Sequence, residues 1–266
     1  MEDPTGNLTM ARPADPRSRD VLIAAARAEF ARAGLRGARV EDITAACGLS
    51  KGAFYLHFES KEALFGQLVG GFQSEIARCS EDRTRTMEAF AQEHGPLAST
   101  DVARRTRKFT RMLELERTLD CQTLEVMWTY RDVLGVLIGG SQGTPFDKVV
   151  WAMTELEVQR IASEFGGEQS KGACRTDVAP ELFGALIVGT YLLLAQRMIA
   201  LTEKPDLAGW AVSIQKLVRE GSLPARALQT SADIQPVTKK LSGHSTASPH
   251  RLRQAQERSL KTRSKP

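Results

Sequence analysis

One short predicted helix carries polar and basic side chains at a spacing that suits binding to a polyanion. Lys51 and Tyr55 lie four residues apart, and Gly52 falls between them on the same side of the helix. Phe54 and Phe58 recur at the same spacing on the opposite side. The amino-terminal end of a short helix can point backbone N–H groups at phosphate oxygens, and a glycine lets the backbone approach closely. One face of this helix is therefore predicted to pack and the other to read a bound partner.

The elements around this helix are marked by capping residues. Ser50 and Ser60 are expected N-caps, for this helix and for the longer one that follows it. Gly48 separates it from a helix over residues 40–47, and Gly34 ends the first helix of the chain. Two short helices joined by a glycine-containing turn form a helix-turn-helix, whose second helix fits the major groove of DNA.

The rest of the chain shows helical periodicity and no alternation typical of strands. Helices are predicted over residues 61–82, 101–119, 122–139, 146–165, 178–202 and 206–221. Glycine and proline turn signals separate most of them. The predicted fold is all-α, with an N-terminal three-helix helix-turn-helix domain and a C-terminal helical bundle. The predicted domains are an arm over 1–16, the helix-turn-helix domain over 17–61, the bundle over 62–223 and a basic tail without a packed core over 224–266.

Composition and charge narrow the class of protein. The hydrophobic fraction of 42% predicts a folded chain. The net charge is +3 over 17–61, −4 over 62–223 and +7 over 224–266, and the two basic regions suit binding to a polyanion. The apolar run 182–195 is shorter than the roughly 20 residues that cross a bilayer, so no membrane partner is expected. The first residues lack a signal peptide, which predicts the cytoplasm. Four dispersed cysteines and four histidines form no metal, cofactor or catalytic constellation, so we expect no enzyme.

The string Gly-Leu-Ser-Lys-Gly-Ala-Phe-Tyr-Leu-His-Phe-Glu-Ser-Lys-Glu-Ala-Leu, from Gly48 to Leu64, closely resembles the DNA-binding segment of the tetracycline-repressor (TetR) family. The preceding Asp-Ile-Thr and the Phe-Ala-x-x-Gly that ends at Gly34 extend the resemblance, and the remaining chain matches only in helix number and length. The resemblance, together with the face analysis, implies contacts with operator DNA. The predicted DNA-binding residues are Arg39, Thr44, Ser50, Lys51, Gly52, Ala53, Tyr55, His57 and Lys61. Tyr55, His57, Lys51 and Lys61 are expected on phosphates, and Ala53 and Thr44 at base edges.

Two positions depart from the family pattern. Arg39 stands where Thr or Ser often caps the second helix, so that cap is missing and an arginine able to reach phosphate or guanine replaces it. Leu56 stands where a second tyrosine is common. The operator sequence therefore cannot be copied from a relative.

The resemblance also implies that the later helices bind a small effector and form a homodimer. The last two helices, 178–202 and 206–221, are the expected dimer bundle, the first with a small-residue stripe and the second with an apolar face. The expected ligand-pocket residues are Phe109, Met112, Met127, Tyr130, Trp151 and Thr154. Few charged residues are expected to face inward, so the effector is predicted to be apolar or aromatic.

These expectations lead to one principal function and two alternatives. The principal hypothesis is a repressor that leaves its operator when the effector binds. The first alternative is a thiol-based redox regulator that uses Cys79, Cys121 or Cys174. The second is a DNA binder without an effector, aided by its basic tail.

Overall fold

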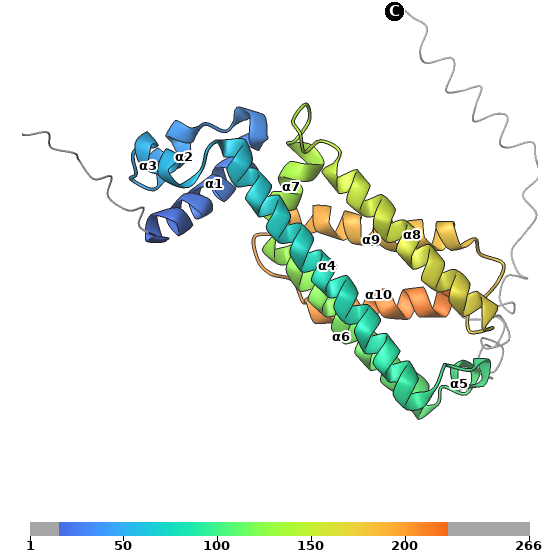
Figure 1. Cartoon of the computed structure of the whole chain (residues 1–266). Helices are drawn as coiled ribbons and strands as arrows, with labels where there is room; N and C mark the ends of the chain where they lie inside the picture. The colour runs from blue at the N-terminus through green and yellow to red at the C-terminus, as the bar shows by residue number, and fades with distance from the viewer. Residues whose placement is uncertain (1–15, 223–266) are drawn as a thin grey trace, which may run out of the picture. The chain divides into compact units, whose positions relative to one another are not determined.

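A computed structural model describes residues 16–222, and within them every regular element is an α-helix (Figure 1). The predicted arm, except Pro16, and the whole predicted tail lie outside the described residues. The helices are α1 (Pro16–Gly37), α2 (Val40–Ala46), α3 (Lys51–His57), α4 (Lys61–His94), α5 (Ser99–Ala103), α6 (Arg107–Thr129), α7 (Arg131–Gly139), α8 (Val149–Ser170), α9 (Pro180–Ile199) and α10 (Leu207–Ser222).

The first three helices begin and end where the local signals predict. Gly34 has a φ of 68° and interrupts the helical path of α1, and Gly48 has the same positive φ after α2. The Ser50 side chain accepts a hydrogen bond from the Ala53 amide, which caps α3, and Ser60 caps α4 in the same way. The capping predictions are confirmed, and short-range sequence signals are sufficient for this part of the fold.

The body of the protein differs from the predicted helix boundaries. Helix α4 continues to His94 and ends at Gly95, whose φ is 73°. The predicted break near residue 120 is absent, and α6 runs on to Thr129. The chain turns instead at Tyr130, where neither glycine nor proline is present. A tertiary contact lies at this turn, where the Arg27 side chain donates a hydrogen bond to the Thr129 carbonyl. The prediction was wrong here because it used local signals alone.

Three hydrophobic clusters hold the helices together. The first joins α1–α3 to the start of α4 and to α7, and includes the fully buried Phe54 and Phe65. The second lies around Phe72 and Met127 between α4, α6, α9 and α10. The third surrounds Phe109 at the far end of α4 and α6. The first cluster therefore connects the helix-turn-helix to the body, so the two share one continuous core.

Helices α8 and α9 pack closely along their lengths. Gly184 makes this approach possible, because a β-carbon at this position would lie 2.5 Å from the Val158 carbonyl oxygen on α8. Part of the small-residue stripe on α9 thus serves contact within the chain. The apolar face of α10 packs on α6, with Leu207 and Ala211 fully buried.

Candidate nucleic-acid interface and interior cavity

Helix α3 is held by its two phenylalanines. The ring centroids of Phe54 and Phe58 lie 5.6 Å apart, and both side chains are buried in the first cluster together with Leu22 and Ile43. The predicted packing face is confirmed. It fixes the rotation of α3 about its axis, because aromatic side chains at this spacing leave only one orientation that buries both.

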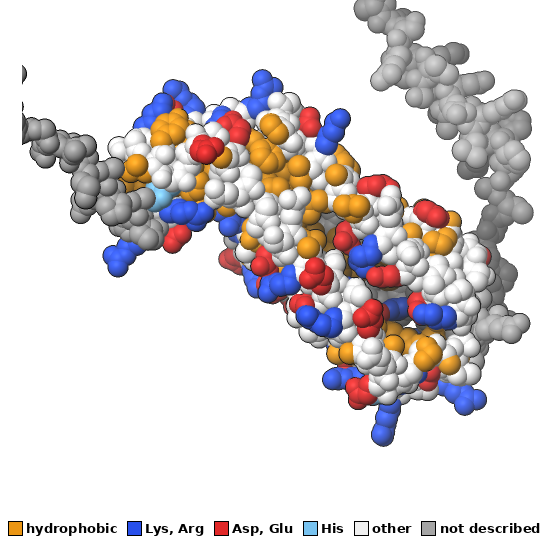
Figure 2. Space-filling model, viewed as in Figure 1, with side chains coloured by type: hydrophobic (Ala, Val, Ile, Leu, Met, Phe, Trp, Pro, Cys, Tyr) orange, Lys and Arg blue, Asp and Glu red, His pale blue; other side chains and the backbone are white. Residues whose placement is uncertain are grey.

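The opposite face of α3 is open to solvent. Tyr55 is 50% exposed and Leu56 is 60% exposed, and Lys51 and Gly52 are also exposed. Sequence reasoning did not include Leu56 among the contact residues. Its place one residue after Tyr55, away from both packing phenylalanines, was the available signal. Figure 2 shows Lys and Arg side chains on the visible surface of the α1–α3 region.

Lys51 is already paired within the helix-turn-helix. Its Nζ lies 2.7 Å from the Glu41 Oε1 on α2, and this hydrogen bond is the largest cause of a raised Lys51 pKa and a lowered Glu41 pKa. Both side chains are about half exposed, so water screens the pair. A phosphate that binds Lys51 would have to share it with Glu41.

The structure places the remaining predicted residues unequally. Ser50 is exposed, and its hydroxyl accepts the capping bond at 3.1 Å. Arg39 is exposed and makes no side-chain cap for α2, as predicted. Ala53 and His57 are half-buried on α3.

Two predicted contact residues face inward. Thr44 is buried, and its hydroxyl donates to the Glu41 carbonyl at 3.1 Å, so this side chain does not lie on the exposed surface. The Lys61 Nζ donates to the carbonyl oxygens of Arg36 at 3.0 Å and Ala38 at 2.7 Å. Lys61 thus caps the end of α1 in this structure rather than pointing outward.

A separate junction ties α1 to α7. Arg27 donates two hydrogen bonds to Asp132, each 2.6 Å long, and its guanidinium lies 5.6 Å from the centre of the Tyr130 ring. Nearby, the Leu35 amide donates to the Gly140 carbonyl at 3.1 Å. The helix-turn-helix is therefore bonded to the α6–α7 turn as well as packed on it.

The body contains a cavity of about 690 Å³ between α4, α6, α8, α9 and α10. Volumes of this size suit small-molecule ligands. Four of the predicted pocket residues line it, namely Phe109, Met112, Met127 and Thr154.

The other two predicted pocket residues lie elsewhere. Trp151 is 61% exposed on the outside of α8, so its assignment to the pocket was wrong. Tyr130 packs between Phe72 and Gly71 at the α6–α7 turn and does not line the cavity. Helical periodicity marks both residues as apolar-face positions but does not say which neighbour each face meets.

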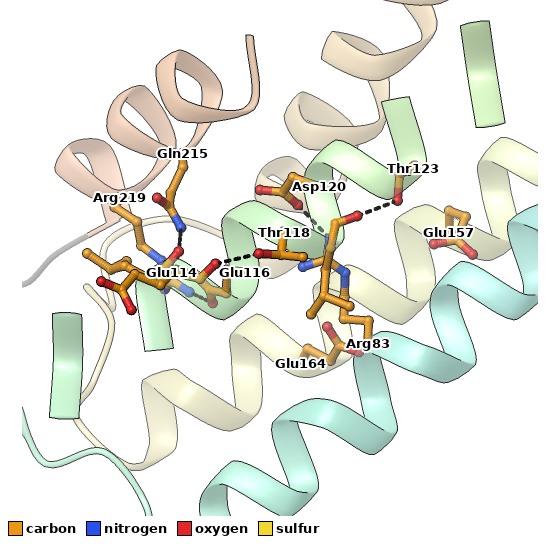
Figure 3. A network of polar contacts seen from close by, with 12 residues as sticks. Arg83, Glu114, Glu116, Thr118, Asp120, Thr123, Glu157, Glu164, Gln215 and Arg219 are labelled. Atoms are coloured by element: carbon orange, nitrogen blue, oxygen red, sulfur yellow. Dashed lines mark hydrogen bonds and ion pairs between the residues drawn. The ribbon is translucent and has the colours of Figure 1, made fainter. Parts of the chain in front are cut away.

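Charged side chains line the cavity, contrary to the prediction that few face inward. Figure 3 shows part of the network that they form. We call this set the polar belt, and it comprises Arg83, Glu116, Asp120, Glu157, Arg160, Glu164, Tyr191 and Arg219. Arg83 on α4 binds Asp120 on α6 at 2.5 Å. Arg219 on α10 binds Glu116 through two hydrogen bonds. The sequence did not reveal the belt because the pairs Arg83–Asp120 and Arg219–Glu116 join residues from distant parts of the chain.

The cysteines give no support to thiol chemistry. Cys79 and Cys174 line the cavity, and all four cysteines are free thiols. Burial raises the pKa of Cys174 to about 11 and also raises the pKa of Cys79 and Cys121. The thiolate is the reactive form, so a raised pKa lowers reactivity at neutral pH.

Large apolar side chains are exposed on α8 and α9. We call this set, Trp151, Leu156, Leu182, Leu186 and Leu193, the α8–α9 surface. Helix α9 is long and apolar enough to cross a membrane by length and composition. Of its most apolar 18-residue window, 17% is buried inside the protein.

Comparison with known proteins agrees with this geometry. Residues 22–68 match a family model described as bacterial regulatory proteins, tetR family. The HTH-type transcriptional repressor DhaR of Mycobacterium sp. strain GP1 is 30% identical over 172 residues, which are 61% of this chain and 72% of that protein. The similarity thus extends well beyond the helix-turn-helix.

Two solved structures share the fold. The ketosteroid transcriptional regulator KstR2 of Mycobacterium tuberculosis aligns with a TM-score of 0.56 and 18% identity, over 80% of this chain and 99% of that one. FadR of Bacillus subtilis, solved in complex with stearoyl-CoA, aligns with a TM-score of 0.51 and 15% identity, over 76% and 98%. At these identities the likeness establishes the architecture.

Proposed function

The chain belongs to the tetR family of bacterial transcriptional regulators, and on that premise we propose that it is a homodimeric repressor released from operator DNA by a small molecule. Its place of action is the cytoplasm, where the chromosome lies. The observation that carries the proposal is the two-sided α3, with a buried face at Phe54 and Phe58 and an exposed face at Lys51 and Tyr55.

The exposed face of α3 supplies the chemistry for DNA binding. Lys51 and the Tyr55 hydroxyl donate to phosphate oxygens, and exposed Leu56 offers an apolar contact of the kind that a thymine methyl group makes. Arg39 lies at the start of α2, where its guanidinium reaches phosphate or guanine. Thr44 and Lys61 take no part in this proposal in their observed positions. Their side chains stabilise the helix-turn-helix instead.

The proposed dimer forms through the α8–α9 surface rather than through α9 and α10. In the single chain, much of the apolar face of α10 packs against α6, where Leu207 and Ala211 are buried, and Leu217 is exposed. Trp151, Leu182, Leu186 and Leu193 are large apolar side chains left in water by the single chain. Their burial against a second copy gives the two-fold symmetry that a palindromic operator requires.

The cavity is the proposed effector site. It adjoins α4, which leads directly to the helix-turn-helix, and α6, whose C-terminal turn contacts Arg27 on α1. A ligand that favours one arrangement of α4 and α6 over another would change DNA affinity through these contacts.

The proposal is tested by selecting duplexes from a random pool with the full chain and footprinting the enriched sequence. A two-fold symmetric site, bound at least about a thousandfold more tightly than unrelated DNA at physiological salt, is the expected result. Candidate compounds are then scored for loss of binding to that site. Enrichment of no sequence over unrelated DNA would contradict the proposal.

A further inference from the structure

The arginines of the polar belt differ in how many of their N–H donors are already hydrogen-bonded. Both Glu116 oxygens accept bonds from Arg219. Arg160 divides its donors between Glu157 and Glu164 on its own helix. Each carboxylate of the belt therefore already has an arginine partner.

Arg83 is the exception among the three belt arginines. A guanidinium carries five N–H donors. Within residues 16–222, Arg83 makes one side-chain hydrogen bond, from Nη2 to Asp120. Asp120 also accepts from Tyr191. Arg83 lines the cavity and reaches from α4 toward α6, as Figure 3 shows. The Nε and Nη1 donors of its guanidinium make no recorded bond within residues 16–222 and are left for a ligand.

The charges around Arg83 determine whether a charged or a neutral ligand suits its free N–H donors. Asp120 already neutralises Arg83, and inside the cavity Glu116 neutralises Arg219. An added carboxylate would meet the charge of Asp120, and an added ammonium group would meet Arg83. A neutral oxygen acceptor uses the free donors without adding charge, because a carbonyl oxygen has two lone pairs and no formal charge.

Large apolar side chains line the cavity on both sides of the belt. Toward the helix-turn-helix the cavity is lined by Phe72, Ile76 and Met127, and toward the other end by Phe90 and Phe109. Arg83 lies 11 residues after Phe72 on α4, which is about 16 Å along a helix with a rise of 1.5 Å per residue. A hydrocarbon chain fits along this longer wall.

We propose that the effector is an uncharged amphipathic carbonyl compound, a ketone, ester or lactone, whose oxygen accepts from a free N–H donor of Arg83 and whose hydrocarbon part lies toward Phe72 and Met127. Only the statement that this compound releases the protein from DNA rests on the proposed function, because binding of the compound is measured without DNA. Removal of the acceptor should weaken binding about tenfold to a hundredfold, the usual effect of a hydrogen bond to a charged group.

Three probes with the same chain length separate the head groups: 2-decanone, decanoate and decylammonium. Their binding to the full chain is measured by displacement of a neutral hydrophobic dye and by calorimetry. The unmodified protein should bind 2-decanone at least about tenfold more tightly than either ion. Tighter binding of decanoate or decylammonium overturns the proposal.

Two variants and one control locate the contact. Arg83→Met should remove the advantage of 2-decanone, whereas Arg85→Met, two residues away on α4 and highly exposed, should leave it unchanged. Asp120→Asn should tighten decanoate binding by removing the opposing charge and leave 2-decanone within about twofold. Circular dichroism and melting confirm folding. Should Arg83→Met fail to fold, Asp120→Asn still decides, since equal changes for both probes overturn the proposal.

Release experiments with the selected operator distinguish failure of this inference from failure of the proposed function. If 2-decanone binds as expected but no compound releases the operator, the function fails and the ligand class stands. If a charged compound releases the operator from the same cavity, the function stands and the ligand class fails.

Discussion

Arg27 on α1 and Asp132 on α7 lie 105 positions apart in the sequence and are joined by two hydrogen bonds of 2.6 Å. Both side chains are about one-quarter exposed, so the pair is only partly screened by water. It connects the DNA-binding helices to the α6–α7 turn beside the cavity.

Breaking this pair should destabilise the protein. Arg27→Gln or Asp132→Asn is expected to lower the free energy of unfolding by about 1.5–3 kcal/mol, because each leaves a half-buried polar partner unsatisfied. Urea unfolding of both single variants and the double variant measures the coupling. Arg78→Gln, which breaks an exposed pair on α4, should cost no more than about 0.5 kcal/mol. Additive effects of Arg27→Gln and Asp132→Asn would show that the pair does not interact.

Loss of a phosphate contact on α3 should weaken binding to all DNA alike. Tyr55→Phe or Lys51→Ala is expected to lower affinity for operator and unrelated duplex by a similar factor, and Lys51→Ala should reduce the salt slope by about 1. Titrations at several salt concentrations test this. Unchanged affinity in both variants would mean that the DNA-binding face is assigned wrongly.

Glu41 should limit the strength of the Lys51 contact. Glu41→Gln frees Lys51 from its 2.7 Å pair and is expected to raise affinity for any duplex several-fold. Asp42→Asn removes the same charge from the neighbouring position and controls for general electrostatics. An equal gain in both variants would exclude a specific role for the pair. Because the Glu41 pKa is lowered in the folded chain, the pair exists at neutral pH and is lost as pH falls through that pKa, with little effect on stability at so exposed a site.

The dimer should depend on the α8–α9 surface. Leu186→Lys is expected to yield a folded monomer by light scattering, since a charge would be buried between two apolar surfaces. Leu217→Lys, at an exposed position on α10, should leave the dimer intact. If Leu217→Lys dissociates the dimer and Leu186→Lys does not, α10 is the interface.

Phe54 should be essential to the helix-turn-helix. Phe54→Ala is expected to cost about 3–5 kcal/mol, as truncation of a buried phenylalanine does. Leu56→Ala on the same helix removes an exposed side chain and should change stability by less than about 0.5 kcal/mol. Thermal unfolding of the two variants gives the comparison, and a similar loss in both would contradict the assigned faces.

The sequence predicts the helix-turn-helix well because its signals are local. Ser50, Ser60, Gly34 and Gly48 act within a few residues, and the spacing of Phe54 and Phe58 fixes one face. The inward orientation of Lys61 was missed because its partners are carbonyl groups more than 20 residues away.

The body was harder to predict because its determinants are tertiary. The turn at Tyr130 depends on Arg27, and the belt depends on ion pairs such as Arg83 with Asp120. Trp151 lies on a helix with two apolar sides, one toward the chain and one toward solvent, and periodicity does not distinguish them.

The close contact between Gly71 and Tyr130 marks a point about which α4 can pivot. A β-carbon at Gly71 would lie 3.1 Å from the Tyr130 hydroxyl oxygen, so the α6–α7 turn bears directly on the backbone of α4. From this point Arg83 is 12 residues away in one direction and Lys61 is 10 away in the other, which are arms of about 18 Å and 15 Å. If α4 tilts as a rigid rod, a 1 Å displacement at Arg83 moves Lys61 by about 0.8 Å the opposite way. In the proposed dimer, two-fold symmetry would double the change in spacing between the two copies of α3, and the fixed pitch of the DNA groove would make DNA affinity depend on that spacing.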